Sequence, residues 1–490
     1  MVEKHVKQKN KKPIPICLSK ECLRSAANLA LSMNTKAHPC EDFYQYACGN
    51  WAKEHPRPDI FQSYDWFRDK QTKVYATVRD FLSRNTSDLP RPVKQAKDLY
   101  TACMDTGKTL DKRGLKPILK VLESLGLPAY PTFINATEDT DYSTYSFDWL
   151  EVVINIKIQL GMDVLIGFDI FTDPKNSSIY KLVMGSPETT NPFPSEDDEY
   201  LDVPEYTVYE IQEHTDMIVK DNNGTASPIW KRYLEGVFNI SNVKLDFDND
   251  KILISDPDLV YMTLMAAYLS KTSPCITLNL FDSNSQVVEV MAAHTTTELR
   301  ILFQRSYEAL GNHDLYTPPR SQQCASAVNE MLGMAVSYAI ADPRFFYITK
   351  PKIEVMLSEM KNALAHLVGQ AKWMDDDTKL ATYQKIIQMK TLVGFPDWLL
   401  DAEKLEKYYE GIEVNTKTHL ENLINIIQVK IKKALNKFRI GNNGSWATDP
   451  TEVNAYHTFQ ENTITVPLVM LQHPFFDLGL EYVIFYVMEF

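Results

Sequence analysis

The sequence is poor in glycine and lacks the glycine-rich loops of several enzyme classes. Only 17 of its 490 residues are glycine. The patterns Gly-x-Gly-x-x-Gly, Gly-x-Ser-x-Gly and the complete P-loop Gly-x-x-x-x-Gly-Lys-Ser/Thr do not occur. These absences argue against nucleotide use and against a serine-hydrolase nucleophile elbow.

An excess of basic residues is also missing. The chain has 51 Lys and Arg against 64 Asp and Glu, a net charge of -13, whereas a nucleic-acid surface needs concentrated positive charge. We therefore expect no nucleic-acid partner. The single basic run, residues 4–12, lies in a polar tail that we interpret as solvated.

Long apolar runs are absent as well. No window holds the 18 or more apolar residues of a membrane-spanning helix, and the first residues lack the apolar core of a signal peptide. The sequence thus predicts no membrane segment and no export signal within the chain.

The ten histidines are scattered, and no two lie four residues apart. A thermolysin-type zinc site needs His-Glu-x-x-His, in which both imidazoles lie on one helical face and the Glu activates a water molecule. That motif does not occur. We predict no metal ligand, no catalytic residue and no cofactor within these residues. His457 and His473 are interpreted as structural.

Cysteines and glycosylation sequons point to an oxidising compartment. Cys17 with Cys22, and Cys40 with Cys48, are spaced like extracellular cystines and have no neighbouring His in ligand spacing. Six Asn-x-Ser/Thr sequons also indicate passage through the secretory pathway. They predict glycosylation at Asn85, Asn135, Asn176, Asn223, Asn239 and Asn443.

Hydrophobic periodicity predicts a mainly α body with a small β element. Helices are expected from about residue 70 through the Pro90–Pro92 break, and over 205–221, 228–236, 257–270, 287–310, 322–340, 352–370 and 416–438. A further helix starts near Asp375 and runs to Gly394. Residues 152–160 and 164–171 are rich in β-branched residues and predict strands, the second in a hairpin with 179–184.

Three motifs carry a resemblance to a known family. They are the cysteine and aromatic pattern from Pro39 to Trp51, the Trp373-Met374-Asp375 helix start, and Glu452-Val453-Asn454-Ala455-Tyr456-His457 followed by residues 462–467. We interpret 463–467 as an edge strand that Pro467 ends. Over residues 17–482 the chain resembles the neprilysin and endothelin-converting-enzyme family of zinc endopeptidases.

The resemblance implies specific pairings and roles. Cys17 should bridge Cys22, and Cys103 should bridge Cys324. Cys40 and Cys48 pair with the catalytic part in the family, so here they are free, paired with each other or mispaired. In the family an extended substrate lies along the edge strand, and the matching positions are Asn454, whose amide both donates and accepts, and Ala455, which allows close approach.

These observations predict a multi-helix cap domain with a small β element and a stub of a thermolysin-like catalytic domain. The expected parts are a disordered tail (1–16), a first segment with the family cysteine motifs (17–69), a helical peptidase domain (70–440) and a partial catalytic domain (441–490). We expect a catalytically inactive relative with a peptide-binding role, and the resemblance implies that it is extracellular or a plasma-membrane ectodomain. The alternative is a zinc metalloendopeptidase of extracellular peptides whose catalytic half lies outside these 490 residues.

Overall fold

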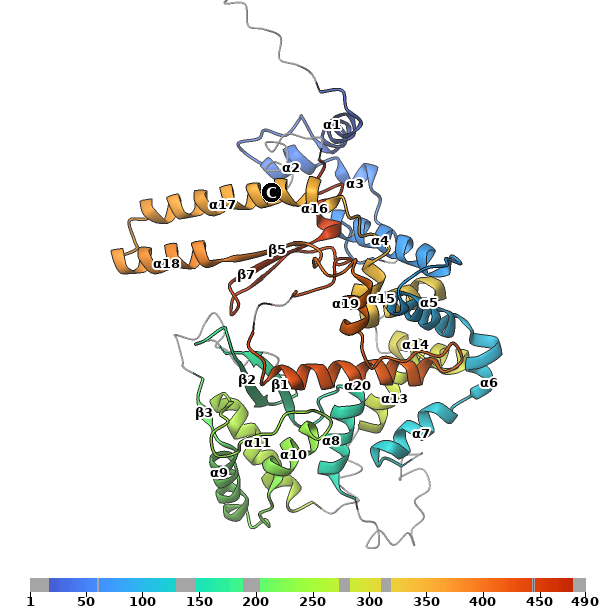
Figure 1. Cartoon of the computed structure of the whole chain (residues 1–490), viewed down its shortest axis with the longest axis vertical. Coiled ribbons are helices and arrows are strands. Elements are labelled where there is room, and N and C mark those ends of the chain that lie inside the picture. The colour runs from blue at the N-terminus through green and yellow to red at the C-terminus, as the bar shows by residue number, and fades with distance from the viewer. Residues whose placement is uncertain are drawn as a thin grey trace, which may run out of the picture.

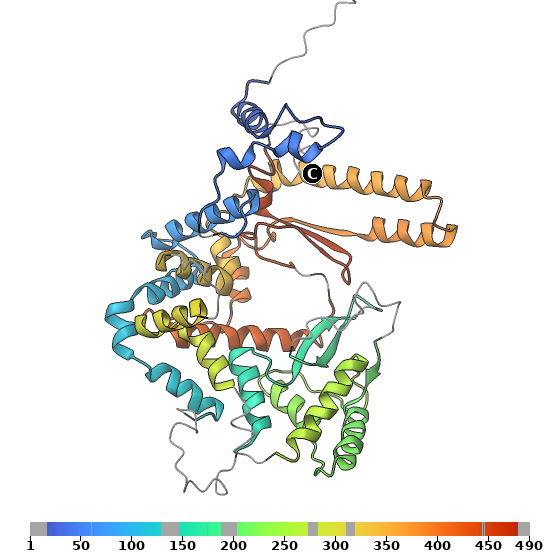
Figure 2. The same ribbon diagram turned by 180° about the vertical axis from the view of Figure 1, so that it is seen from behind.

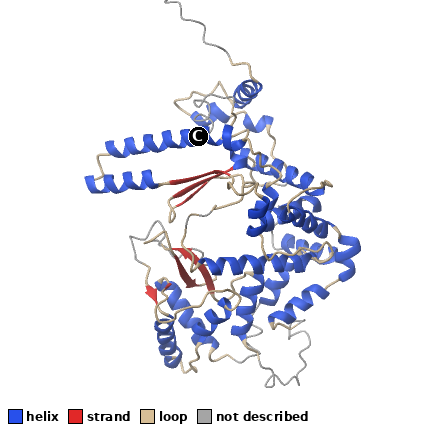
Figure 3. Ribbon diagram, in the orientation of Figure 1, coloured by secondary structure: helices blue, strands red, loops and turns tan. Residues whose placement is uncertain are grey.

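The computed structural model describes residues 17–59, 61–128, 147–173, 175–187, 203–272, 283–309, 319–442, 444 and 446–478. The predicted tail (1–16), Asn135, Asn443, Cys275 and the chain after residue 478 lie outside the described residues. The fold is mainly α, as predicted, with a few short strands (Figure 3).

The helices up to the first sheet cover the N-terminal third of the chain. They are α1 (Lys20–Ser32), α2 (Phe43–Cys48), α3 (Trp51–Glu54), α4 (Trp66–Ser83), α5 (Arg91–Met104), the π-helix η1 (Thr106–Leu110), α6 (Asp111–Arg113), α7 (Lys116–Leu125) and α8 (Trp149–Leu160). The remaining ones are α9 (Val208–Asp221), α10 (Ile229–Phe238), α11 (Asp256–Leu269), α13 (Ser283–Ala292), α14 (Thr297–Ala309), α15 (Arg320–Ser337), α16 (Phe345–Ile348), α17 (Lys350–Gln370), α18 (Asp376–Gln388), α19 (Ala402–Tyr408), α20 (His419–Lys437) and the 3₁₀ turn η4 (Leu468–Leu471).

The strands form two separate sheets. The first has the order β1-β2-β4-β3, from β1 (Gly167–Thr172), β2 (Tyr180–Gly185), β3 (Glu205–Tyr206) and β4 (Ile252–Leu253). The second has the order β5-β7-β6, from β5 (Lys390–Gly394), β6 (Tyr456–Thr458) and β7 (Thr463–Pro467). In Figure 1 the second sheet lies above α20, and strands β1 and β2 of the first sheet lie beside the left end of that helix.

One predicted strand is a helix. Residues 152–160 belong to α8, which begins where the Asp148 carboxylate accepts the Glu151 amide at 3.2 Å and ends at Gly161 with φ 70°. Six of its apolar side chains are buried, on several sides of the helix. The β-branched residues in this segment are typical of a strand, which explains the prediction. The helix nevertheless has a polar stripe, because Glu151, Asn155 and Gln159 recur every four residues and none of them is buried. The predicted hairpin of the following residues is confirmed, since β1 and β2 pair antiparallel from Gly167↔Gly185 to Thr172↔Tyr180.

The helix predicted to reach Gly394 ends earlier. The Asp375 carboxylate caps it as expected, accepting the Thr378 amide at 2.7 Å, but α18 stops at Gln388. Residues 390–394 then form β5, which pairs in parallel with β7 from Lys390↔Thr463 to Gly394↔Pro467. The partner strand lies about seventy residues further along the chain, so local periodicity does not indicate this pairing.

Two apolar cores share helix α20. Leu420 and Leu435 pack into the core formed with α7 to α11 and the first sheet. Leu423 and Ile426 pack into the core formed with α4, α5, α15, α19 and the second sheet. Figure 2 shows α20 running between these two parts of the molecule. The helix therefore fixes the two cores relative to each other.

Both predicted disulfides are present. Cys17 pairs with Cys22, and Cys103 of α5 pairs with Cys324 of α15. Of the alternatives left open for Cys40 and Cys48, the structure has both as free thiols. Within the described part of the chain, no helix combines the length and apolar character that crossing a bilayer requires.

Candidate functional site

The strand predicted to lie at the sheet edge is the central one. β7 pairs with β5 on one side and with β6 on the other, where Tyr456 lies opposite Thr465. The prediction placed 463–467 at the edge because of Pro467, but the proline falls only at the end of the strand. β6 is therefore an outer strand, with β5 on the opposite side of the sheet. Among the described residues no strand pairs with its other backbone edge.

Asn454 and Ala455 lie directly before this outer strand. Both are exposed, and the Asn454 Oδ1 accepts the Ala455 backbone N–H at 2.8 Å. This hydrogen bond uses the amide oxygen locally. Among the residues that the structure describes, the Nδ2 group finds no hydrogen-bond acceptor, so it remains available to a ligand.

The residues that precede Asn454 are held firmly. Val453 is buried, and its backbone N–H donates to Gln71 Oε1 of α4 at 3.0 Å. The Thr451 hydroxyl donates to Asn329 Oδ1 of α15 at 2.8 Å, and both side chains are buried. These contacts place the exposed pair on a rigid base, which lowers the entropic cost of binding.

A polar cluster joins the turn of the second sheet to the first sheet. Asn442 Nδ2 donates to Glu461 Oε1 at 3.0 Å and to the Thr172 hydroxyl at 3.2 Å. The Asn442 backbone N–H donates to the Ser178 carbonyl at 2.8 Å. Glu461 lies in the turn between β6 and β7, and Thr172 ends β1. Sequence reasoning missed this cluster, because its members are isolated polar residues far apart in the chain.

His473 has a structural environment. Its Nδ1 lies 3.3 Å from Asp477 Oδ2, and the same carboxylate accepts two N–H groups of Arg24 at 2.5 and 2.7 Å. Burial, followed by the nearby Arg24 guanidinium, lowers the pKa of His473. The cluster fastens α1 to the chain beyond η4.

The described residues do not fit a zinc ion. No three His, Cys, Asp or Glu side chains gather within this part of the chain. The His457 Nε2 is buried without a hydrogen-bond partner, but a lone imidazole is not a zinc site.

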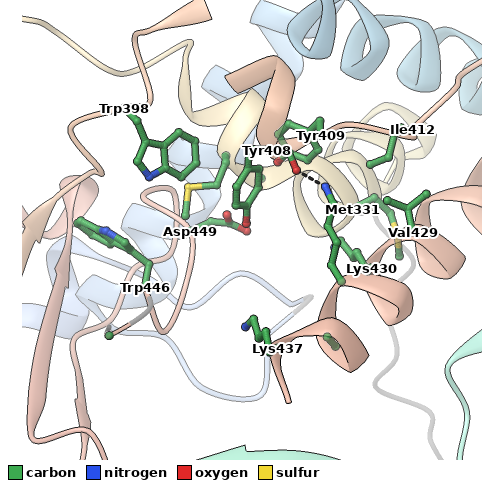
Figure 4. A pocket seen from close by; sticks show the side chains of 15 residues that line it. Met331, Trp398, Tyr408, Tyr409, Ile412, Val429, Lys430, Lys437, Trp446 and Asp449 are labelled. Atoms are coloured by element: carbon green, nitrogen blue, oxygen red, sulfur yellow. Dashed lines mark hydrogen bonds between the residues drawn. The ribbon is translucent and has the colours of Figure 1, made fainter. Parts of the chain in front are cut away.

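A pocket lies beside α20, between α15, α19 and the segment that leads to Asn454. Its walls include Trp398, Tyr408, Lys430 and Asp449 (Figure 4). No motif in the sequence predicts this pocket. The only available signal was the spacing of Lys430, Lys433 and Lys437, which places all three on one helical face.

The fold is that of known zinc metalloproteases. The solved structure of zinc metalloprotease Zmp1 from Mycobacterium tuberculosis with an inhibitor superposes with a TM-score of 0.65 at 16% identity, over 93% of this chain and 71% of that one. PepO from Lactobacillus rhamnosis gives a TM-score of 0.67 at 13% identity, over 91% and 73%. At these identities the likeness establishes the fold alone.

The sequence profile of peptidase family M13 matches residues 39–220 and 205–396, so the chain belongs to that family of zinc metallopeptidases. Among curated relatives, mouse neprilysin is 23% identical over 94% of this chain and 68% of its own length. The endothelin-converting enzyme homolog of Locusta migratoria is 24% identical over 94% and 69%. The predicted family is confirmed.

Proposed function

We propose that these 490 residues bind extended peptides along β6, through Asn454 and Ala455, without hydrolysing them. The observation that carries the proposal is the outer strand, which the exposed pair precedes directly. A peptide can add to such an edge as a further strand, with backbone hydrogen bonds for affinity. The absence of His-Glu-x-x-His from the sequence supports binding without turnover.

Strand addition makes a prediction about the peptide backbone. The probe is a fluorescein-labelled apolar hexapeptide, titrated by fluorescence polarisation against the full chain. The matched probe carries N-methyl groups on alternate amides, which removes backbone donors and keeps the side chains. We expect saturable binding of the first probe and much weaker binding of the second. Equal binding of both would contradict strand addition.

The site is tested by substitution. Replacing Asn454 with Ala removes one hydrogen-bonding side chain, for which we expect a loss of about 2- to 12-fold in affinity, equivalent to about 0.5–1.5 kcal/mol. Asn362→Ala is the matched control, because Asn362 is exposed on α17. Ala455→Leu should block close approach. If all three variants bind the peptide like the parent chain, the site lies elsewhere.

A second candidate is the zinc metalloendopeptidase whose catalytic half lies outside these residues. It is favoured by the length of the relatives, since the chain covers 68% of mouse neprilysin. Zinc content and mass-spectrometric detection of peptide cleavage distinguish the two functions when they are measured on the protein isolated from its natural source. Stoichiometric zinc with chelator-sensitive cleavage by that protein would overturn binding without turnover.

We also propose an extracellular location with glycosylation at the predicted sequons. Asn85, Asn176, Asn223 and Asn239 all have exposed side chains, which supports access by the glycosylation machinery. The two disulfides fit an oxidising compartment. Expression through a secretory pathway should give a chain whose mass falls on treatment with a peptide N-glycosidase. An unchanged mass would contradict the proposal.

A further inference from the structure

The pocket beside α20 has a volume of about 530 Å³, a size typical of small-molecule sites. It lies between α15, α19, α20 and a segment that contributes Gly444, Trp446 and Asp449, and no residue of β6 lines it. Figure 4 shows its side chains arriving from these separate elements. The pocket is therefore distinct from the peptide edge, and a ligand could bind in it whether or not a peptide binds along β6.

One wall of the pocket is aromatic. The rings of Trp398 and Tyr408 stack with centroids 4.7 Å apart and an interplanar angle of 27°. Trp446 contributes a further indole to the lining (Figure 4). Flat aromatic surfaces of this kind favour a planar apolar group through offset or edge-to-face contact.

The facing helix supplies positive charge. Lys430 donates to the Glu330 carbonyl at 3.0 Å, and Lys433 donates to the Tyr408 carbonyl. Lys437 is exposed, and within the described residues its Nζ makes no hydrogen bond or ion pair. Lys437 is thus the lining cation available to a ligand.

A single carboxylate opposes these three lysines. Asp449 packs against the backbone of α15 so closely that a Cβ added at Gly333 would lie 2.0 Å from its Oδ2 atom. Burial raises the pKa of Asp449 to about 6, and Lys430 is the cation that acts against this rise. The positive charge of Lys430 offsets the negative charge of Asp449, so the remaining charges of the lining, on Lys433 and Lys437, are positive. An anion is favoured over a cation.

We propose that this pocket binds a small aromatic carboxylate, with its ring against Trp398, Tyr408 and Trp446 and its carboxylate at Lys437. Ring and carboxylate occur together in free aromatic acids and at the carboxyl end of peptides that finish in Phe or Tyr. Both sources share the chemistry that the lining recognises: a charge-assisted hydrogen bond at one end and aromatic packing at the other.

The test uses the full chain and isothermal titration with 3-phenylpropionate. Saturable binding is expected, and phenethylamine, which carries the same ring and a positive charge, should bind much more weakly. Lys437→Gln should weaken binding of the acid about tenfold, whereas the matched control Lys432→Gln, on the same helix but outside the lining, should leave it unchanged. Asp449→Asn should strengthen it, since a competing negative charge is removed.

Two further ligands separate the sources. Binding of the tripeptide Ala-Ala-Phe as well as of 3-phenylpropionate assigns the pocket to peptide ends, and binding of the free acid alone assigns it to free aromatic acids; both results support the site. The proposed site would be overturned if phenethylamine bound more tightly than 3-phenylpropionate, or if the two lysine variants had equal effects. It would also be overturned if the tripeptide and its carboxyl-terminal amide bound with equal affinity, or if none of these ligands bound saturably. Lys437 is exposed, so its variant should fold.

Discussion

The disulfide between Cys103 and Cys324 should stabilise the fold far more than the one between Cys17 and Cys22. The sequence separations are 221 and 5 residues. In the chain-entropy model, a disulfide lowers the conformational entropy of the unfolded chain and so stabilises the folded state. At 25 °C this stabilisation is about 5 kcal/mol for the long loop and about 2 kcal/mol for the short one. The two bonds in one chain therefore allow an internal comparison.

Burial adds to the difference. Cys103 and Cys324 are 1% and 0% exposed, whereas Cys17 lies on the surface. Replacing the buried pair by Ala removes packed sulfur atoms as well as the bond, for which we add about 1 kcal/mol. The double variants should differ by about 4 kcal/mol in the free energy of unfolding. Arg320 donates to the backbone carbonyl of Cys103 at 2.9 and 3.1 Å, and neither double substitution removes that acceptor.

The readout should be local, because a chain with two cores can unfold in more than one step. Hydrogen exchange of peptides from α5 and α15, followed by mass spectrometry, reports the opening free energy around the buried bond. We expect a large loss of protection there in Cys103→Ala/Cys324→Ala and little in Cys17→Ala/Cys22→Ala. Equal changes in both variants would refute the dependence on loop length and burial.

Four further substitutions have defined outcomes, the first three in urea unfolding and the fourth in hydrogen exchange. Gly394→Ala should lower the free energy of unfolding by about 2–5 kcal/mol, because Gly394 has φ 83° and an added Cβ would lie 2.2 Å from the Phe345 ring. Gly369→Ala in α17 should instead raise the free energy of unfolding by about 0.5–1 kcal/mol, because the space around Gly369 is open. Asp449→Asn should stabilise by up to about 3 kcal/mol at pH 8. A folded-state pKa raised to about 6 means that ionised Asp449 destabilises the fold at high pH, so the gain should vanish below about pH 4. Glu461→Ala should destabilise the fold by about 1–3 kcal/mol, because the Asn442 side-chain amide loses one of its acceptors. The measurement is hydrogen exchange, which should increase in β1.

Local signals in the sequence predicted most of the helices. α4, α5, α9 and α20 each bury one apolar stripe, and their caps or flanking breaks lie close to the expected positions. The family resemblance also predicted a long-range contact, the pairing of Cys103 with Cys324 across 221 residues. Hydrophobic periodicity is a local signal and does not predict such a pairing.

The errors have two physical origins. α8 was predicted to be a strand because its β-branched residues outweighed the four-residue spacing of Glu151, Asn155 and Gln159, which marks its polar face. β5 was predicted to continue α18 because its partner β7 lies far along the chain. For the same reason β7 was placed at an edge. The order of strands in a sheet depends on pairing between distant segments, and the local pattern from Thr463 to Pro467 gives no information about those partners.

The position of β6 depends on elements from both halves of the chain. β7 holds it on one side, and Asn442 links the turn between them to Thr172 at the end of β1. The segment between α20 and β6 forms a wall of the aromatic pocket, and α20 itself packs into both cores. A ligand in that pocket would contact Gly333 of α15 and Asp449, and α15 also holds the chain before Asn454 through the hydrogen bond between Thr451 and Asn329. Binding at the two sites should therefore be coupled through α15 and residues 449–453. Titrating the hexapeptide with and without 3-phenylpropionate measures that coupling as a ratio of affinities.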